Sequence, residues 1–337
     1  MPHTAVSSAV IMVKSTTGAL RVVGSAMITG EGVGWEGLGG AGREETEVEF
    51  WQPTTVADAL ALKAEHPGAA PITGGTDVMV EINFDQRRPD ALLDLTRVHE
   101  LAQWGTEDDG VVRLGAAVTY ARVITELGDV LPGLAMASRT VGSPQIRNRG
   151  TVGGNLGAAS PAGDAHPALL AADAEVELAS VRGTRLVAVR DFFSGPKRHV
   201  GEADELITAV RIRPPSGPQQ FAKIGTRNAM VISVAAFGLA LHPDRRQVGT
   251  GIGSAAPTPR RAEDAEQYLA GALDDAGLWE SRGELPPEVA REFGLRVRAA
   301  ASPIDDVRGT AAYRLHSLAV MARRCAVWAW ADYRRAA

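Results

Sequence analysis

TVGGNLGAASPAGDAHPALL occupies residues 151–170 and decides how the rest of the chain is interpreted. Gly153 and Gly154 are adjacent, so two β-carbons are missing at one point, and a ligand can approach the backbone N–H groups closely. Successive N–H groups in a tight turn form a concavity suited to phosphate oxygens. Asp164, nine residues after Asn155, could accept hydrogen bonds from sugar hydroxyls. Taken alone, this stretch fits equally well a glycine turn between strands with Asp164 as a helix cap.

A second glycine pair favours the ligand interpretation. PITGGTDV, residues 71–78, places Gly74 and Gly75 directly before Thr76 and Asp77. Two such loops about 80 residues apart could hold the two ends of one pyrophosphate. A mononucleotide P-loop is excluded, because no lysine followed by Ser or Thr ends the loop at residues 153–155.

Composition bounds the class of protein. The 337 residues are enough for two or three domains, and 45% hydrophobic with 22% charged content is ordinary for a globular chain. A net charge of −5 argues against a nucleic-acid surface, and no apolar run has the length of a membrane span. Cys325 is the only cysteine, which excludes an internal disulfide and a cysteine-ligated iron–sulfur cluster. We therefore expect a cytoplasmic protein.

Three regions differ in pattern. Residues 1–45 are rich in Gly, Ser and Thr without a sustained period, and we expect a flexible N-terminal extension. GLGGAG at residues 37–42 spells a dinucleotide fingerprint, but it neither follows a buried strand nor opens a helix, so we reject it. Strands and helices alternate from Val48, where a capping-box variant at Thr55 and Asp58 starts a helix, which predicts an α/β subdomain.

The later segments predict mainly antiparallel structure. AEVELAS and TRLVAV, residues 174–180 and 184–189, predict a β-hairpin. RPPSGP at residues 213–218 is the expected domain boundary. Antiparallel strands and helices are expected after it, ending in a long helix over about 310–333. Leu315, Leu318, Ala322, Cys325 and Ala329 recur there at helical spacing and predict a core stripe.

Several segments in the same order resemble one family. SPQIRNRGTVGGNLGAASPAGD, ELITAVRI, FAKIGTRNAMVISVAAFGLAL, APTPRRAEDAEQYLAG and ASPIDDVRGTAAYRLH, together with the two glycine loops, resemble the FAD-binding subunit of molybdenum hydroxylases, which include xanthine dehydrogenase and aerobic carbon monoxide dehydrogenase. The resemblance implies an α+β fold: a two-subdomain FAD-binding domain of the vanillyl-alcohol-oxidase (PCMH-like) type over residues 46–215, divided near 110. A small antiparallel sheet with helices is implied over residues 216–337.

The resemblance also implies a cofactor site. It maps FAD contacts onto Pro71, Ile72, Thr73, Gly74, Gly75, Thr76, Asp77, Val78, Thr151, Val152, Gly153, Gly154, Asn155, Asp164, Ile207 and Lys223. The glycines would give N–H groups to the pyrophosphate, Ile207 would pack on the ring system, and Lys223 could place a positive charge near it. Lys223 would otherwise be interpreted as a solvated strand-edge lysine. No metal constellation and no catalytic side chain is assigned, because the flavin performs the electron chemistry.

The function implied is an electron-transfer subunit of a hetero-oligomeric, xanthine-dehydrogenase-like oxidoreductase. Electrons would pass from a molybdopterin-binding large subunit through a partner 2Fe-2S subunit to FAD on this chain, and then to NAD+ or another acceptor. Two alternatives remain: a self-sufficient FAD-dependent oxidoreductase of the same fold, and an assembly subunit that has lost FAD. The intact glycine loops and Asp164 argue against the second.

Overall fold

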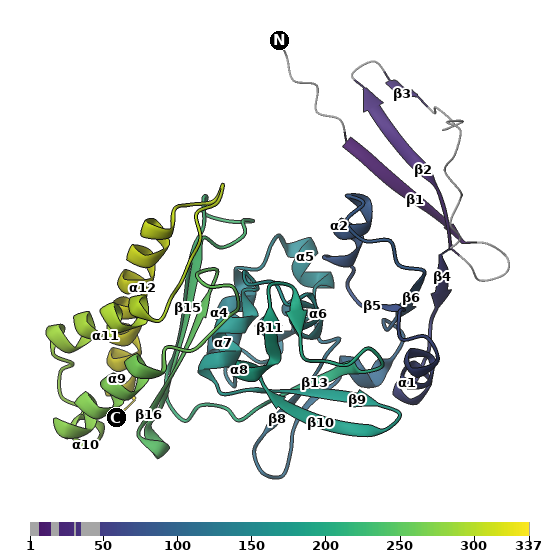
Figure 1. Ribbon diagram of the computed structural model, residues 1–337. Coiled ribbons are helices and arrows are strands. Elements are labelled where there is room, and N and C mark those ends of the chain that lie inside the picture. Colours follow the sequence, from purple (N-terminus) through teal and green to yellow (C-terminus); the bar gives the residue numbers. More distant parts are fainter. Residues whose placement is uncertain (1–6, 15–19, 30–31, 35–47, 337) are drawn as a thin grey trace.

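The computed structural model describes residues 7–14, 20–29, 32–34 and 48–336. The N-terminal strands form a separate antiparallel sheet of β1 (Ser7–Lys14), β2 (Leu20–Thr29) and β3 (Gly32–Gly34), drawn in purple in Figure 1. None of the three pairs with a strand of another sheet. Whether residues 1–45 are flexible stays a prediction, and residues 37–42 with their fingerprint-like glycines lie outside the described residues.

The first subdomain is built on a small parallel sheet. Its strand order is β4 (Glu49–Trp51), β6 (Ala91–Asp94) and β5 (Ala70–Ile72), and parallel pairing requires crossovers. The crossovers hold α1 (Val56–Glu65) and α2 (Val78–Asn83). The predicted cap of α1 is confirmed, since the Thr55 hydroxyl accepts from the Asp58 N–H at 3.1 Å. The expected α/β alternation is also confirmed.

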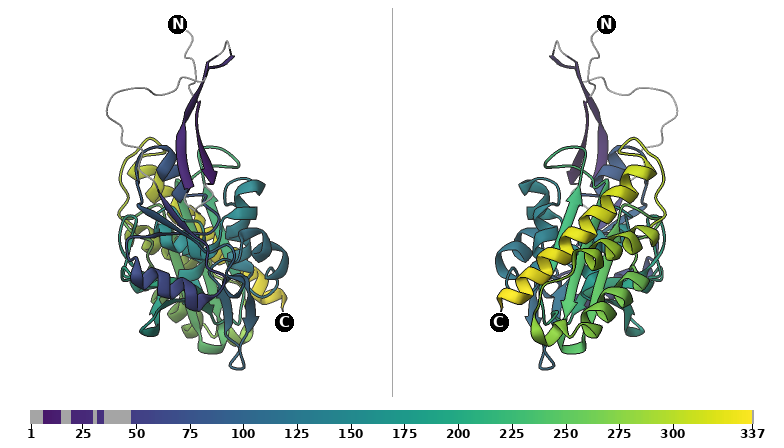
Figure 2. Two further views of the ribbon diagram at one scale, coloured as in Figure 1. Left: turned by 90° about the vertical axis from the view of Figure 1, so that its right-hand side faces the viewer. Right: turned by 90° about the vertical axis from the view of Figure 1, so that its left-hand side faces the viewer.

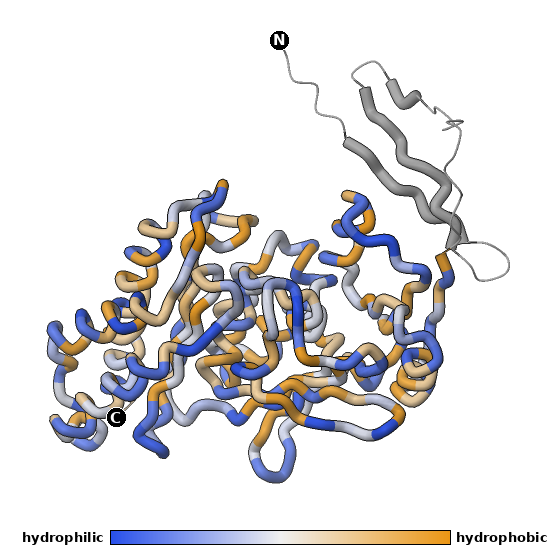
Figure 3. Tube along the Cα trace, viewed as in Figure 1, coloured by the Kyte–Doolittle hydropathy of each residue, from blue (hydrophilic) through white to orange (hydrophobic). Residues whose placement is uncertain are grey.

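The second subdomain is built on a five-stranded antiparallel sheet. The strand order is β10 (Gly183–Ala188), β9 (Glu175–Ser180), β13 (Leu206–Ile212), β8 (Val112–Gly115) and β7 (Trp104–Thr106). The predicted hairpin is therefore confirmed as β9 and β10. The short η1 (His99–Ala102) leads into this sheet. Its β7–β8 turn is hydrophilic, whereas apolar strand residues lie inside the subdomain (Figure 3).

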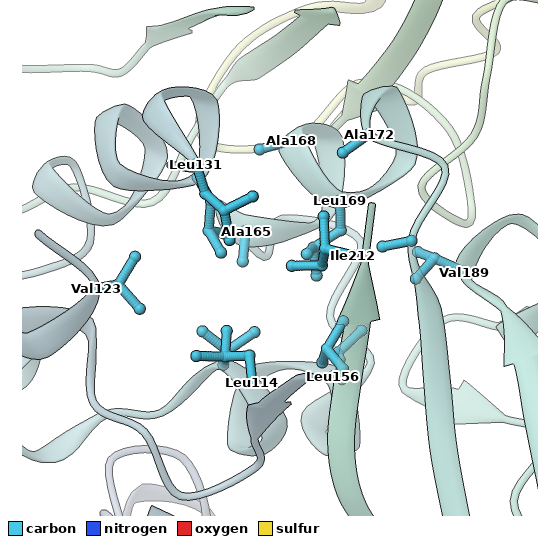
Figure 4. Packing of buried hydrophobic residues seen from close by; sticks show 14 of the residues in the cluster. Leu114, Val123, Leu131, Leu156, Ala165, Ala168, Leu169, Ala172, Val189 and Ile212 are labelled. Atoms are coloured by element: carbon cyan, nitrogen blue, oxygen red, sulfur yellow. The ribbon is translucent and has the colours of Figure 1, made fainter. Parts of the chain in front are cut away.

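Short helices lie beside the antiparallel sheet, and most of them contribute buried residues to one core. They are α3 (Tyr120–Glu126), α4 (Pro132–Arg139), α5 (Pro144–Arg149), α6 (Val152–Ala158), α7 (Ala165–Ala171) and α8 (Val189–Phe192). Strands β11 (Phe193–Gly195) and β12 (Arg198–His199) follow. Figure 4 shows Leu114 and Ile212 of the sheet turned toward Leu156 of α6 and Leu169 of α7. This core fixes the position of the helices that carry the second glycine pair.

The C-terminal domain is one antiparallel sheet covered by helices. Its strands are β14 (Gln219–Ile224), β15 (Ala235–His242) and β16 (Gln247–Gly253), with η2 (Pro243–Arg245) in the β15–β16 turn. The covering helices are α9 (Glu263–Asp275), α10 (Leu278–Ser281), α11 (Pro287–Ala299) and α12 (Ala311–Arg335). In the right-hand view of Figure 2, α12 crosses the strands diagonally.

The predicted core stripe of the last helix is confirmed except at its first position. Leu318, Ala322, Cys325 and Ala329 are buried, whereas Leu315 is half-buried. Burial raises the pKa of the Cys325 thiol to about 12, so it stays protonated and packs as a small apolar group.

The antiparallel subdomain and the C-terminal domain pack against each other at glycine residues. Helix α7 lies directly on β15 and β16, on the sheet face opposite α12. A β-carbon at Gly238 would lie 2.5 Å from the Pro167 carbonyl oxygen, and one at Gly251 would lie 2.1 Å from it. One at Gly249 would lie 2.1 Å from the Ala171 oxygen. Glycine is therefore required at these positions of β15 and β16, because the backbones of the two domains pack directly against each other.

Candidate functional site

A cavity of about 630 Å³ lies where the two glycine segments meet. That volume is within the range of small-molecule and cofactor sites. All predicted site residues line this cavity except Val152 and Lys223. Val152 is fully buried in the core beneath the cavity. Lys223 does not line the cavity but contacts the lining residue Asp164. The structure therefore brings together residues from three separate stretches of sequence.

The two segments touch directly. The Thr73 and Thr151 hydroxyl oxygens are 3.2 Å apart and share a hydrogen bond. A β-carbon at Gly74 would lie 2.0 Å from the Arg149 carbonyl oxygen, so only glycine lets the backbones approach this closely. Gly75 has φ +74°, a left-handed conformation that also favours glycine. The first glycine pair is required by this junction, whatever the cavity binds.

The second glycine pair lies in a helix and not in an open turn. The Thr151 hydroxyl accepts from the Gly154 N–H at 2.9 Å and so caps α6. The Gly153 N–H donates to the Ala116 carbonyl at 3.1 Å. The N–H groups of Gly153 and Gly154 are therefore already bonded, contrary to the expectation that they form an open concavity.

The first segment offers the free donors instead. No acceptor among the described residues reaches the N–H groups of Gly74, Gly75 and Thr76. An anion at this turn would meet successive unpaired N–H groups, together with the Thr73 hydroxyl. Free N–H groups for an anion are therefore present at residues 74–76, but not at Gly153 and Gly154.

Asp164 is not a capping residue. It precedes α7, but its side chain makes no cap hydrogen bond. Its Oδ2 instead accepts from Lys223 Nζ at 2.6 Å and from the Thr140 hydroxyl at 3.3 Å. Burial raises the pKa of Asp164 to about 6, against the lowering effects of the Lys223 ammonium and the Thr140 hydroxyl. The structure rejects the helix-cap alternative.

Three buried polar atoms at the cavity have no partner among the described residues. They are the Tyr120 hydroxyl, Asn155 Oδ1 and Asp164 Oδ1. A buried polar atom without a hydrogen bond costs roughly 1–3 kcal/mol, so three such atoms on residues that line one cavity favour a polar ligand there. Burial raises the pKa of Tyr120 well above its usual value, and the Asp164 charge adds to this, so its hydroxyl is a donor.

Apolar side chains form another part of the wall. Ile207 of β13, Val141 and Ile146 line the cavity, and Met230, Val231 and Ile232 reach it from the C-terminal domain. Polar and apolar linings suit a ligand with both a flat ring system and a hydroxylated or charged chain.

Two histidines and two lysines have local roles. His166 Nε2 lies 3.2 Å from the Asn155 carbonyl oxygen, so His166 is a local hydrogen-bonding residue. Desolvation lowers its pKa to about 4, and it is neutral. His199 also lines the cavity, and burial lowers its pKa. Lys63, which lines the cavity, donates to the Pro67 and Ala69 carbonyls at 2.8 and 2.7 Å. Lys223 is neither solvated nor part of the lining.

Sequence reasoning missed Lys63, Tyr120 and Met230–Ile232. Tyr120 stands in an apolar stretch and is typical of a core residue. No motif marks its unpaired hydroxyl. Met230–Ile232 follow the predicted domain boundary and reach the cavity only because α7 packs on the C-terminal sheet.

Residues 46–215 match the family described as the FAD binding domain in molybdopterin dehydrogenase. The chain belongs to this family. Residues 220–329 match a second family, described as the CO dehydrogenase flavoprotein C-terminal domain. It is thus an oxidoreductase subunit of the xanthine dehydrogenase and carbon monoxide dehydrogenase family, and its α+β fold is confirmed.

Known proteins of this FAD-binding family are similar over most of the chain. The nicotinate dehydrogenase FAD-subunit of Eubacterium barkeri is 36% identical over 239 residues, which are 67% of this chain and 80% of that protein. The putative xanthine dehydrogenase FAD-binding subunit of Escherichia coli (strain K12) is 30% identical, covering 82% and 93%. The reconstituted CO dehydrogenase from Oligotropha carboxidovorans superimposes with a TM-score of 0.76 and 29% identity, covering 85% and 98%.

The described residues contain neither a membrane-spanning helix nor a metal-binding cluster. None of their helices is both long and apolar enough to cross a membrane. No group of three or more His, Cys, Asp or Glu side chains among them is placed to hold a metal ion.

Proposed function

We propose that this chain holds FAD in the cavity at the two glycine segments and passes electrons between partner subunits and an acceptor. The observation that carries the proposal is that three residues lining one cavity each hold a buried polar atom without a partner among the described residues, beside free backbone N–H groups. FAD has the matching chemistry, because it combines an anionic pyrophosphate, a hydroxylated chain and an apolar ring.

Each part of the lining suits one part of the cofactor. The N–H groups of Gly74–Thr76 and the hydroxyls of Thr73 and Thr151 suit phosphate oxygens. Asp164 Oδ1 can accept from a sugar or ribityl hydroxyl, and the Tyr120 hydroxyl can donate. Ile207 and Val141 suit a ring face. Val152 and Lys223 do not line the cavity, so they would influence FAD only through the lining residues.

The rest of the electron path lies on other chains. A bound flavin supplies electron exchange between a cluster and a two-electron acceptor. The single cysteine leaves this chain without ligands for a cysteine-bound cluster. We therefore assign a 2Fe-2S cluster and molybdopterin to partner subunits of a cytoplasmic hetero-oligomer, and NAD+ as the candidate acceptor. This chain would bind and orient FAD and keep water from part of it.

Separation of the half-reactions tests this division of labour. The full chain loaded with FAD should be reduced by NADH under anaerobic conditions, and it should not oxidise xanthine, an aldehyde or carbon monoxide. Addition of the cluster and molybdopterin subunits should make flavin reduction depend on the substrate. Substrate turnover by the isolated, FAD-loaded chain would contradict the proposal and support a self-sufficient flavoenzyme.

A further inference from the structure

Asp164 links the cavity to the other domain. It precedes α7 in the FAD-binding domain, whereas Lys223 lies on β14 of the C-terminal domain. Both side chains are about nine-tenths buried, with 9% and 8% of their surfaces exposed. Asp164 lines the cavity; its Oδ2 accepts from Lys223, and its buried Oδ1 has no partner among the described residues. One oxygen of this carboxylate therefore binds the other domain, and the second is left without a protein partner beside the cavity.

Lys223 is fixed on the same side. Its Nζ also donates to the Thr140 carbonyl at 3.0 Å, and the Thr140 hydroxyl donates to Asp164. Thr140 ends α4, so three elements hold the carboxylate. Helix α7 itself packs on β15 and β16 through glycine contacts that leave no room for a shift. The orientation of Asp164 thus depends on the docking of the C-terminal domain.

We propose that Lys223 is a positioning residue of the cofactor site, which keeps Asp164 ionised and aimed into the cavity, so that cofactor binding and domain docking strengthen each other. The inference rests on the proposed function, with FAD as the ligand. Reciprocity follows from linkage: if docking favours FAD binding, FAD must favour docking by the same factor.

The charges around Asp164 explain why Lys223 is needed. Burial raises the pKa of this carboxyl, and among the described residues Lys223 alone brings a positive charge against it. The Tyr120 hydroxyl from α3 also senses the Asp164 charge, which raises its pKa further, and it stays a neutral donor. His166 of α7 bonds to the Asn155 carbonyl and is neutral. Without Lys223, Asp164 would take up a proton at a higher pH and become a weaker acceptor.

A double-mutant cycle on the full chain tests the proposal. FAD affinity is measured for the wild type, Asp164→Asn, Lys223→Met and the double variant. Each single change should weaken binding by about ten- to a hundredfold, because a hydrogen bond to a charged group is lost or weakened. The double variant should bind no worse than Asp164→Asn. If Lys223→Met costs the same factor in both backgrounds, Lys223 contacts FAD directly and the proposal is overturned.

The pH profile separates positioning from a general structural role. Wild-type affinity should fall as the pH drops below about 6, where Asp164 becomes protonated. In Lys223→Met the fall should begin at a higher pH, and in Asp164→Asn it should be absent. Identical profiles for the wild type and Lys223→Met would overturn the proposal.

If a variant does not fold, hydrogen exchange on the wild-type protein still tests the coupling between FAD binding and domain docking. FAD should slow amide exchange in β14, which does not line the cavity, and should leave α11 unchanged as a control. Unchanged exchange in β14 with FAD bound would overturn the coupling. If the wild type binds no FAD at all, the proposed function fails first, so the two failures are distinguishable.

Discussion

Two glycine-rich regions of this chain look alike in sequence and differ in what they face. Gly154 is exposed at the cavity, and a β-carbon there would meet only the hydroxyl oxygens of Thr151 and Thr73, at 2.9 and 3.4 Å. Gly251 in β16 is buried against the backbone of α7. A missing side chain therefore makes room for a ligand in one region and for another domain in the other.

The difference shows that a glycine pair is not by itself evidence of a binding loop. Gly153 and Gly154 are neighbours, yet Gly153 belongs with Gly251, because its β-carbon would lie 2.6 Å from the Ala116 carbonyl oxygen. Both residues of the pair line the cavity, but only Gly154 is exposed there, whereas Gly153 is buried. Substitutions at these positions should therefore separate loss of fold from loss of cofactor.

Gly251→Val should have the largest effect. Its side chain would overlap the Pro167 carbonyl, and neither backbone can move without separating the domains. We expect the free energy of unfolding to fall by about 3 kcal/mol, and FAD binding to be lost with the fold. Denaturant unfolding measures the loss, and near-wild-type stability would show that the domain interface is looser than described.

Gly153→Val should resemble Gly251→Val despite its place in the glycine pair. The clash with Ala116 is on the core side of α6, so we expect about 2 kcal/mol of destabilisation. The same unfolding experiment applies. A stable Gly153→Val protein that merely loses FAD would place this glycine with Gly154 and weaken the comparison.

Gly154→Val should remove FAD binding while the fold survives. Its branched side chain would fill part of the cavity and press on the Thr151 cap, so stability should fall by only about 1 kcal/mol. Gly271→Val is the matched control, since Gly271 also lies in a helix and its β-carbon would meet nothing within 4 Å. Full flavin occupancy in Gly154→Val would make α6 a purely structural element.

Deletion of residues 1–45 should have the smallest effect. The strands described there form their own sheet and pair with none of the others. FAD content and melting temperature should stay within error of the full chain in a thermal scan. A drop of several degrees would show that this sheet is docked on the FAD-binding domain.

Element types were predictable where the pattern is periodic. The hairpin of β9 and β10 and the buried stripe of α12 follow from the spacing of apolar residues. Helix α6 was not predictable, because three glycines lower its helix propensity by roughly 1 kcal/mol each. It forms because Thr151 caps it and because Val152 and Leu156, four residues apart, are both buried.

The site was predictable only in part, for a similar reason. The glycine segments carry motif-like spacing, so their residues could be named from the sequence. The Asp164–Lys223 pair joins residues 59 positions apart, and nothing local in either stretch indicates the contact. Tyr120 differs from a core tyrosine only in lacking a partner for its hydroxyl, which no sequence pattern records.

Titration of the full wild-type chain with FAD, beside Gly154→Val and Gly271→Val, most directly tests whether the cavity at the glycine segments is a cofactor site. We expect saturable binding of one FAD per chain by the wild type and by Gly271→Val. Gly154→Val should show at least about a hundredfold weaker binding with its fold intact. Failure of the folded wild type to bind FAD, or equal binding by all three proteins, would contradict the assignment.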